Sequence, residues 1–130
     1  MYLFKNGERY SGSLKDGLKH GGGVYIYMNG NVYDGEWARD RKNGKGKYVY
    51  YSTGESYEGD WKEGEKSGRG KAIYAYGDVY NGDFSKGERN GFGVMEFHTG
   101  ARVEGNWIDG KLNGKAKMKY SNGDSYEGEW

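Results

Sequence analysis

The sequence predicts an all-β fold: a single-layer, twisted or curled antiparallel meander of about twelve strands, with one β-hairpin per 23-residue repeat. Three observations support this prediction. Apolar and polar residues alternate within each unit. Glycines, 26 in all, recur at fixed positions, and proline is absent. A motif of the form Tyr-x-Gly-x-aromatic returns at intervals of 23, 24, 23, 23 and 23 residues, starting at Tyr10, Tyr33, Tyr57, Tyr80, Val103 and Tyr126.

The first strand of each unit is predicted by strict alternation. In residues 33–37, Tyr33, Gly35 and Trp37 occupy alternate positions with acids between them, and residues 57–61 and 80–84 repeat the pattern. A period of two places the rings on one face of a strand. Glycine within a strand weakens it, so its recurrence suggests that a Trp or Tyr ring lies flat against a backbone without Cβ atoms.

The second strand follows a Gly-x-Gly pair and carries apolar residues at its second and fourth positions, as in residues 47–50. Asn-Gly pairs such as Asn29-Gly30 predict two-residue type I′ turns, because both central residues of that turn need a positive φ. The other connection, for example residues 38–43, is expected to be longer and charged. The extra residue of the 24-residue unit is expected near residues 51–53, as a bulge or a longer turn.

These elements divide the chain into one array of repeats. The division is a half repeat at residues 1–9, repeats at 10–32, 33–56, 57–79, 80–102 and 103–125, and a half repeat at 126–130. Because both ends fall within a unit, we expect the chain to be a fragment of a longer array.

The composition excludes several classes of protein. Cysteine is absent, which excludes a disulfide framework, a thiolate zinc site and a cysteine nucleophile. No stretch approaches the roughly 18 apolar residues of a membrane span, and residues 1–5 do not resemble a signal peptide. These features predict a cytoplasmic protein.

Charge is distributed unevenly although the net charge is +1. Equivalent parts of the units hold 17 of the 20 Lys and Arg residues but only 6 of the 19 acids; these parts are residues 15–23, 38–47, 62–71, 85–94 and 108–119. If the repeats stack, these parts stack too, and one edge of the sheet becomes basic.

The units resemble MORN repeats (membrane occupation and recognition nexus) over the whole chain. Residues 57–70 match the family pattern fully, as Tyr-x-Gly-x-Trp-x-x-Gly-x-x-x-Gly-x-Gly. The chain departs from that pattern at Leu14, Asp40, Phe84, Val103 and Ala116. The resemblance implies a single sheet of hairpins and non-enzymatic roles: scaffolding, dimerisation, and binding of peptide segments, membranes or phosphoinositides. A rival architecture is an aromatic and glycine-rich solenoid of the choline-binding type, which would favour carbohydrate recognition outside the cell.

The aromatic face is the first candidate site. A single sheet normally buries one face against a second layer, so the rings are expected to form the core, and part of the stripe to form a groove floor. Aromatic grooves bind helices and extended peptides, so the partner is expected to be a peptide segment or a second copy of the chain. The candidate residues are Tyr33, Trp37, Tyr50, Tyr57, Trp61, Tyr74, Tyr80, Phe84, Phe97 and Trp107.

The basic edge is the second candidate site. Lys and Arg near an anionic lipid surface each contribute about 1 kcal/mol to binding, so this edge predicts contact with anionic phospholipids. The candidate residues are Arg39, Arg41, Lys42, Lys111, Lys115, Lys117 and Lys119. Nucleic acid is not expected as a partner, because net charge is near zero and acids flank the rings that would stack on bases.

Catalysis is not expected. The two histidines, His20 and His98, occupy different positions in their repeats, and the recurring acids are typical of a solvated face. We therefore predict no catalytic residue, metal site or cofactor. The function predicted is a protein-interaction scaffold linked to cytoskeleton, cilium or membrane organisation. The alternative is a peripheral membrane module that binds through the basic edge.

Overall fold

The computed structural model describes residues 2–130, and all of its regular elements are strands. The strands are β1 (Tyr2–Leu3), β2 (Arg9–Lys15), β3 (Leu18–Ile26), β4 (Val32–Ala38), β5 (Arg41–Val49), β6 (Ser56–Lys62), β7 (Glu65–Ile73), β8 (Val79–Ser85), β9 (Glu88–Glu96), β10 (Arg102–Ile108), β11 (Lys111–Lys119) and β12 (Ser125–Glu129).

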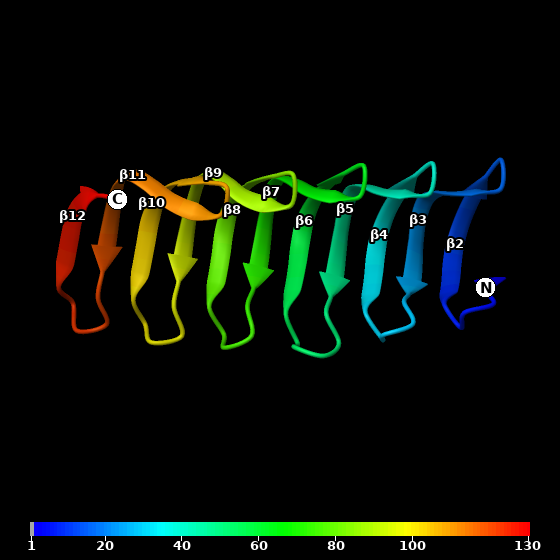
Figure 1. Cartoon of the computed structure of the whole chain (residues 1–130), viewed down its shortest axis with the longest axis horizontal. Coiled ribbons are helices and arrows are strands. Elements are labelled where there is room, and N and C mark those ends of the chain that lie inside the picture. The colour runs from blue at the N-terminus through cyan, green and yellow to red at the C-terminus, as the bar shows by residue number, and fades with distance from the viewer. Residues whose placement is uncertain (1) are drawn as a thin grey trace.

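The strands form one twelve-stranded sheet in chain order, in which each strand pairs antiparallel with its sequence neighbours (Figure 1). The predicted meander, with one hairpin per repeat, is confirmed. The two chain ends lie at opposite ends of the row (Figure 1). Over residues 2–130 there is no helix to cover the sheet, and hence none long and apolar enough to cross a membrane.

Tight turns join the two strands of each repeat, where the sequence predicted a longer connection. Between β4 and β5 the whole turn is Arg39 (φ 48°) and Asp40 (φ 69°). Between β6 and β7 it is Glu63 (φ 49°) and Gly64 (φ 89°). Positive φ at both central residues defines a type I′ turn. The prediction of a long charged loop at residues 38–43 is therefore wrong, because the charged residues on either side belong to strands.

Wide loops join successive repeats, and they contain the Asn-Gly pairs. In residues 27–31, Gly30 has a φ of 91° and its N–H donates to the Tyr27 carbonyl at 3.0 Å, while the Tyr27 N–H donates to the Asn31 carbonyl at 2.9 Å. One left-handed glycine after a turn is the pattern of a longer hairpin loop with a bulge. The prediction of two-residue turns at these pairs is wrong. The extra residue does lie in a wide loop, where the Gly54 N–H reaches the Tyr50 carbonyl at 2.8 Å.

A bulge bends the second strand of each repeat. Gly12 pairs with Gly23 and Leu14 with Lys19, so the single residue between Gly12 and Leu14 faces three residues of β3. Gly21 lies in this bulge with a φ of 84°, which a residue with a Cβ rarely adopts. Bulges bend a strand and increase its twist. The strand ends that carry the tight turns therefore curve over, along the top of Figure 1.

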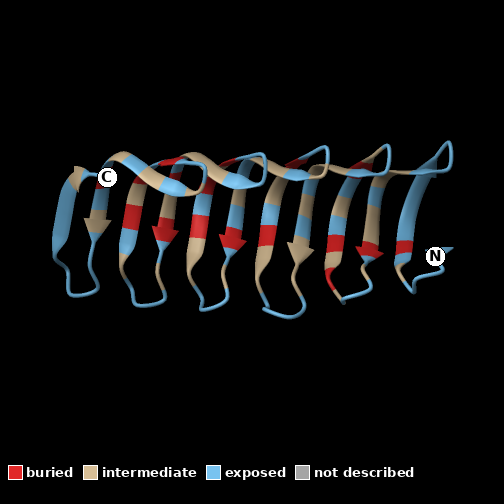
Figure 2. Ribbon diagram, viewed as in Figure 1, coloured by how far each residue is buried: buried red, intermediate tan, exposed pale blue. Residues whose placement is uncertain are grey.

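The core is a continuous zigzag of rings on one side of the sheet, which we call the aromatic face. Tyr33 packs nearly perpendicular to Trp37 of its own repeat and to Trp61 of the next, with ring centroids 5.0 and 5.3 Å apart. Edge-to-face packing is the arrangement that ring quadrupoles favour. Equivalent edge-to-face contacts recur along the sheet from Tyr10 to Trp107. Figure 2 shows the resulting buried bands, which recur from strand to strand along the sheet.

Each leading tyrosine lies against bare backbone. A Cβ at Gly46 would lie 2.2 Å from the Tyr33 hydroxyl oxygen, and that hydroxyl donates to the Glu36 carbonyl at 2.9 Å. A Cβ at Gly35 would first meet the Gly46 Cα, at 2.4 Å. The predicted close approach of a ring to bare backbone is confirmed. The Tyr33 ring lies against Gly46 of the second strand, and Gly35 of the first strand lies against the backbone of Gly46. The Trp37 indole N–H adds a bond to the preceding repeat, donating to the Gly23 carbonyl at 3.0 Å.

Candidate functional site

The structure divides the ten predicted residues of the aromatic face into two sets. Seven are buried, with exposed fractions between 0% and 7%; they are Tyr33, Trp37, Tyr57, Trp61, Tyr80, Phe84 and Trp107. These rings hold the repeats together and offer a partner almost no surface. The other three, Tyr50, Tyr74 and Phe97, are partly buried.

The partly buried rings form an outer row near the ends of the second strands. Tyr50 follows the end of β5 and lies 4.7 Å from Tyr48 of that strand, and Tyr48 lies 5.6 Å from Tyr27 of the preceding repeat. Tyr74 and Phe97 pack against the buried cluster at the equivalent positions of the next two repeats. The outer row is therefore the part of the aromatic face that a ligand can reach.

A row of cations, which was not predicted from the sequence, crosses the same face. These residues, each nine positions after the leading tyrosine, form what we call the cation row: Lys19, Lys42, Lys66 and Arg89. The Lys42 Nζ lies 5.5 to 5.7 Å from the centroids of four rings, including Tyr48 and Trp61. The Arg89 Cζ lies 4.8 Å from the Trp107 centroid. Distances below about 6 Å indicate cation–π contacts.

The charges of this row are unevenly balanced. Lys19 pairs with Asp40 at 3.2 Å. Within residues 2–130, Lys42, Lys66 and Arg89 have no carboxylate oxygen within 4.0 Å. Burial, with a smaller contribution from the nearby charge of Lys19, lowers the pKa of Lys42. The interior of the aromatic face is thus positively charged and lacks counter-ions over three successive repeats.

Two adjoining hollows lie beside the cation row, and the first of them also reaches Tyr50 of the outer row. One, of about 350 Å³, is lined by Tyr50 and Trp61 together with Lys42, Lys66 and Glu65. The other, of about 380 Å³, also reaches Lys42 and continues to the rings of the preceding repeat. The aromatic face is therefore hollowed, and rings and cations line the hollows together.

The residues of the predicted basic edge lie in different environments. Arg39 lies in a tight turn and Arg41 is exposed beside it, but Lys42 points across the rings. Lys111 is exposed at the start of β11, next to its tight turn. Lys42 therefore belongs to the cation row, and its predicted role in lipid binding stays a prediction.

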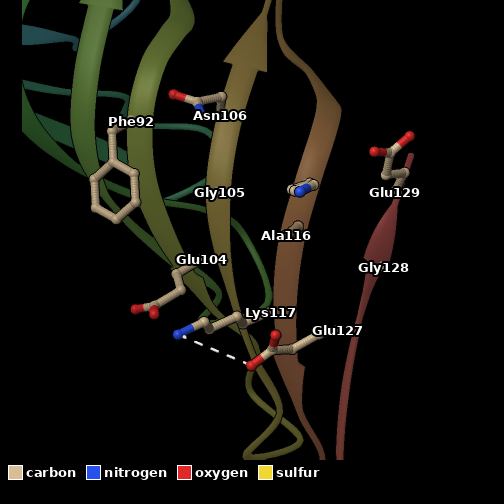
Figure 3. Close-up of a pocket in the computed structure, with 10 residues that line it drawn as sticks. Phe92, Glu104, Gly105, Asn106, Ala116, Lys117, Glu127, Gly128 and Glu129 are labelled. Atoms are coloured by element: carbon tan, nitrogen blue, oxygen red, sulfur yellow. Dashed lines mark ion pairs between the residues drawn. The ribbon is translucent and has the colours of Figure 1, made fainter.

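The remaining lysines of the predicted edge, Lys115, Lys117 and Lys119, are exposed along β11. Lys115 pairs in register with Glu129, and the Lys117 Nζ lies 3.9 Å from the Glu127 carboxylate (Figure 3). A hollow of about 530 Å³ beside them is lined by acids and amides as well as by Phe92. Acids thus oppose Lys115 and Lys117, whereas Lys119 pairs in register with Arg102 and Ser125. Lipid binding at this edge stays a prediction.

Several of the recurring acids have a local role. The Glu36 carboxylate accepts from the Lys45 N–H at 2.8 Å, and the Asp60 carboxylate accepts from the Arg69 N–H at 3.0 Å. Both N–H groups lie at the bulge of the second strand, so these acids satisfy backbone donors there. Among residues 2–130, no three His, Asp or Glu side chains are grouped as metal ligands would be.

One sheet of stacked hairpins, with a hollowed aromatic face, defines a β-repeat array. The family model of the MORN repeat matches residues 10–32, 33–54, 57–79, 80–102 and 104–125. The chain belongs to the MORN-repeat family, as its sequence predicted. No curated protein sequence matches the chain.

The chain is similar to two solved structures. One is the SAS-4 TCP domain of Drosophila melanogaster in complex with a proline-rich motif of Ana2, with a TM-score of 0.56, 17% identity, and coverage of 96% of this chain and 74% of that one. The other is the TCP10c domain of Drosophila melanogaster Sas-4, with a TM-score of 0.47, 15% identity, and coverage of 96% and 88%. At 17% identity the first likeness shows a shared fold.

Proposed function

We propose that this chain is a non-enzymatic protein-interaction scaffold whose aromatic face binds a peptide segment or a second copy of the chain. The observation that carries the proposal is the pair of hollows beside the cation row, which rings of the aromatic face also line. Aromatic-lined grooves bind peptides, and tyrosine and tryptophan provide much of the binding energy at interfaces.

Two further findings support this function. The chain belongs to a repeat family, and stacked repeats create extended binding surfaces. The similar SAS-4 TCP domain was solved in complex with a proline-rich motif, so a sheet of this fold is compatible with a bound peptide. We further propose a cytoplasmic setting linked to cytoskeleton, cilium or membrane organisation, and we propose the division into five repeats and two half repeats given above.

Affinity capture with matched variants tests the proposal. In the face variant, Tyr50→Ser, Tyr74→Ser and Phe97→Ser remove the outer row. Proteins retained by the wild type should be lost by this variant, and mass spectrometry of the captured proteins measures the loss. Sedimentation of the purified chain tests for a second copy as the occupant.

The control variant removes three exposed rings elsewhere, through Tyr51→Ser, Tyr76→Ser and Phe92→Ser. Tyr51 and Tyr76 are 75% and 84% exposed in wide loops, and Phe92 is 48% exposed beside the hollow of Figure 3. This control should keep the captured partners. If the face variant captures and self-associates as the wild type does, the aromatic face is not the binding surface.

A further inference from the structure

We propose that the occupant of the aromatic face is an acidic, extended peptide segment whose carboxylates pair with Lys42, Lys66 and Arg89. This inference rests on the proposed function and adds the chemistry of the partner. Its basis is the charge left over inside the face: three successive repeats each place a cation among rings, with no carboxylate within 4.0 Å among residues 2–130.

The cations are held in place before any partner binds. Lys66 lies 5.4 Å from the ring centroids of both Tyr50 and Tyr57. The Arg89 guanidinium donates to the Gly110 carbonyl at 2.7 Å while stacking near Trp107. Rings and a carbonyl stabilise these cations without neutralising them. An anion that enters the face therefore meets positioned charges in a partly dehydrated setting, where ion pairs are stronger than in open water.

Acids near the face leave this charge uncompensated. Asp40 is already paired with Lys19, at one end of the row. Glu63 and Glu65 line the two hollows but are exposed, and neither lies within 4.0 Å of a cation in the row. The net excess is therefore positive from Lys42 to Arg89, and charge complementarity points to an acidic partner.

The spacing of the row suits an extended segment. Successive repeats are two strands apart, so the equivalent cations repeat every ~10 Å along the sheet. A polyproline II chain advances about 3.1 Å per residue with three residues per turn, so every third side chain returns to the same side of the chain at nearly the same interval. The side chains between these acids would then face the outer row of Tyr50, Tyr74 and Phe97.

A peptide suits the site better than a membrane does. The Lys42 amine lies within 5.7 Å of four ring centroids, and Lys42 lines a hollow instead of standing at a protruding tip. A bilayer presents a broad surface and reaches exposed side chains first, whereas a single chain can enter a hollow of about 350 Å³. Lipid binding through the same cations is therefore the competing outcome of the test.

The test measures the affinity of the intact chain for two peptides by fluorescence anisotropy. One peptide is four Glu-Pro-Leu units, and the other is four Gln-Pro-Leu units. The wild type should bind the Glu peptide about tenfold more tightly, in the range expected for three partly exposed ion pairs. That preference should shrink as salt is added. Lys42→Gln with Lys66→Gln and Arg89→Gln should abolish it.

Two variants keep the result interpretable. Lys47→Gln with Lys62→Gln and Lys71→Gln removes the same charge from positions that alternate away from the rings, and should keep the preference. Lys42→Arg with Lys66→Arg and Arg89→Lys keeps the charge, and should keep the preference even if the Gln variant fails to fold.

Three results would overturn the inference. The wild type could fail to bind the Glu peptide, or it could bind both peptides equally. It could also bind phosphatidylserine vesicles through the three cations and not bind the Glu peptide. None of them affects the capture experiment with the face variant, in which the three cations are intact. Loss of partners there, together with a failed peptide test, would leave the proposed function standing and reject the acidic partner.

Discussion

Replacing Gly23 by alanine should destabilise the array strongly, whereas the same change at the adjacent Gly22 should be tolerated. A Cβ at Gly23 would lie 2.3 Å from the Tyr10 hydroxyl oxygen and 2.5 Å from its Cε1. Carbon contacts in a packed interior are about 3.5 to 4.0 Å. Gly22 has no atom within 4 Å of its added Cβ and no positive φ.

The Tyr10 ring cannot move aside without further cost. Its side chain is 1% exposed, its hydroxyl donates to the Ser13 carbonyl at 2.7 Å, and its ring packs edge-to-face with Trp37, with centroids 5.8 Å apart. Overpacking a core costs about 1–3 kcal/mol, and a lost hydrogen bond adds about 1 kcal/mol. We therefore expect Gly23→Ala to lower the unfolding free energy by about 2–4 kcal/mol.

Thermal unfolding followed by circular dichroism measures this difference. For a chain of this length, the loss corresponds to a fall in Tm on the order of 10 °C. Gly22→Ala should shift Tm by no more than about 2 °C, because alanine in an open strand position adds no clash. Equal Tm values for the two variants would show that the contact between ring and backbone does not hold the repeats.

Three other changes test the packing. Trp61→Ala should cost about 3–5 kcal/mol, the range for large core truncations, because the indole is 6% exposed and meets Tyr33 edge-to-face; a Tm like that of the wild type would refute this. Phe84→Trp should stabilise the fold by about 1 kcal/mol. An indole N–H at this position would reach the Gly70 carbonyl, as the Trp61 indole N–H donates to the Gly46 carbonyl. A lower midpoint in urea unfolding would show that the site cannot hold the larger ring. Alkaline unfolding should follow tyrosine ionisation. Burial, and then the bond to Glu8, raises the pKa of Tyr25 to about 12. A folded-state pKa above the unfolded value of about 10 means that this stability is present below pH 10 and lost between pH 10 and 12. Tyrosinate absorbance and circular dichroism should change together in that window, and ionisation that is complete with the fold intact would contradict the link.

The fold followed from the sequence because its signals are local and repeated. Alternation within residues 33–37 places the rings on one face, and the tyrosine intervals place that face in every repeat. The tight turns and the wide loops lie in each other's predicted places, and this has a physical reason. Asn-Gly favours positive φ at both residues, but in the wide loops only the glycine adopts it, whereas Arg39 and Asp40 both do so in a tight turn. The pairing of β4 with β5 therefore imposes a type I′ turn on Arg39 and Asp40, although neither residue favours a positive φ.

The cation row was missed because residues 38–43 were interpreted as a loop. Counting back by twos from Tyr48, through Gly46 and Gly44, reaches Lys42, and the alternation carries through the bulge to the aromatic face. The periodic signal was therefore present in the sequence. What the sequence could not provide is the bend at the bulge, which brings the Lys42 amine over rings of neighbouring repeats.

The hydrogen bonds between strands run along the length of the row, from β1 at one end to β12 at the other (Figure 1). Tension applied at the two ends would stretch those bonds along their own direction, so the load would fall on one strand pair at a time. Each unit that opens would replace about 10 Å of folded length with about 75 Å of extended chain, at the usual rise per residue. Such a ribbon would lengthen in steps under force and would not break all at once.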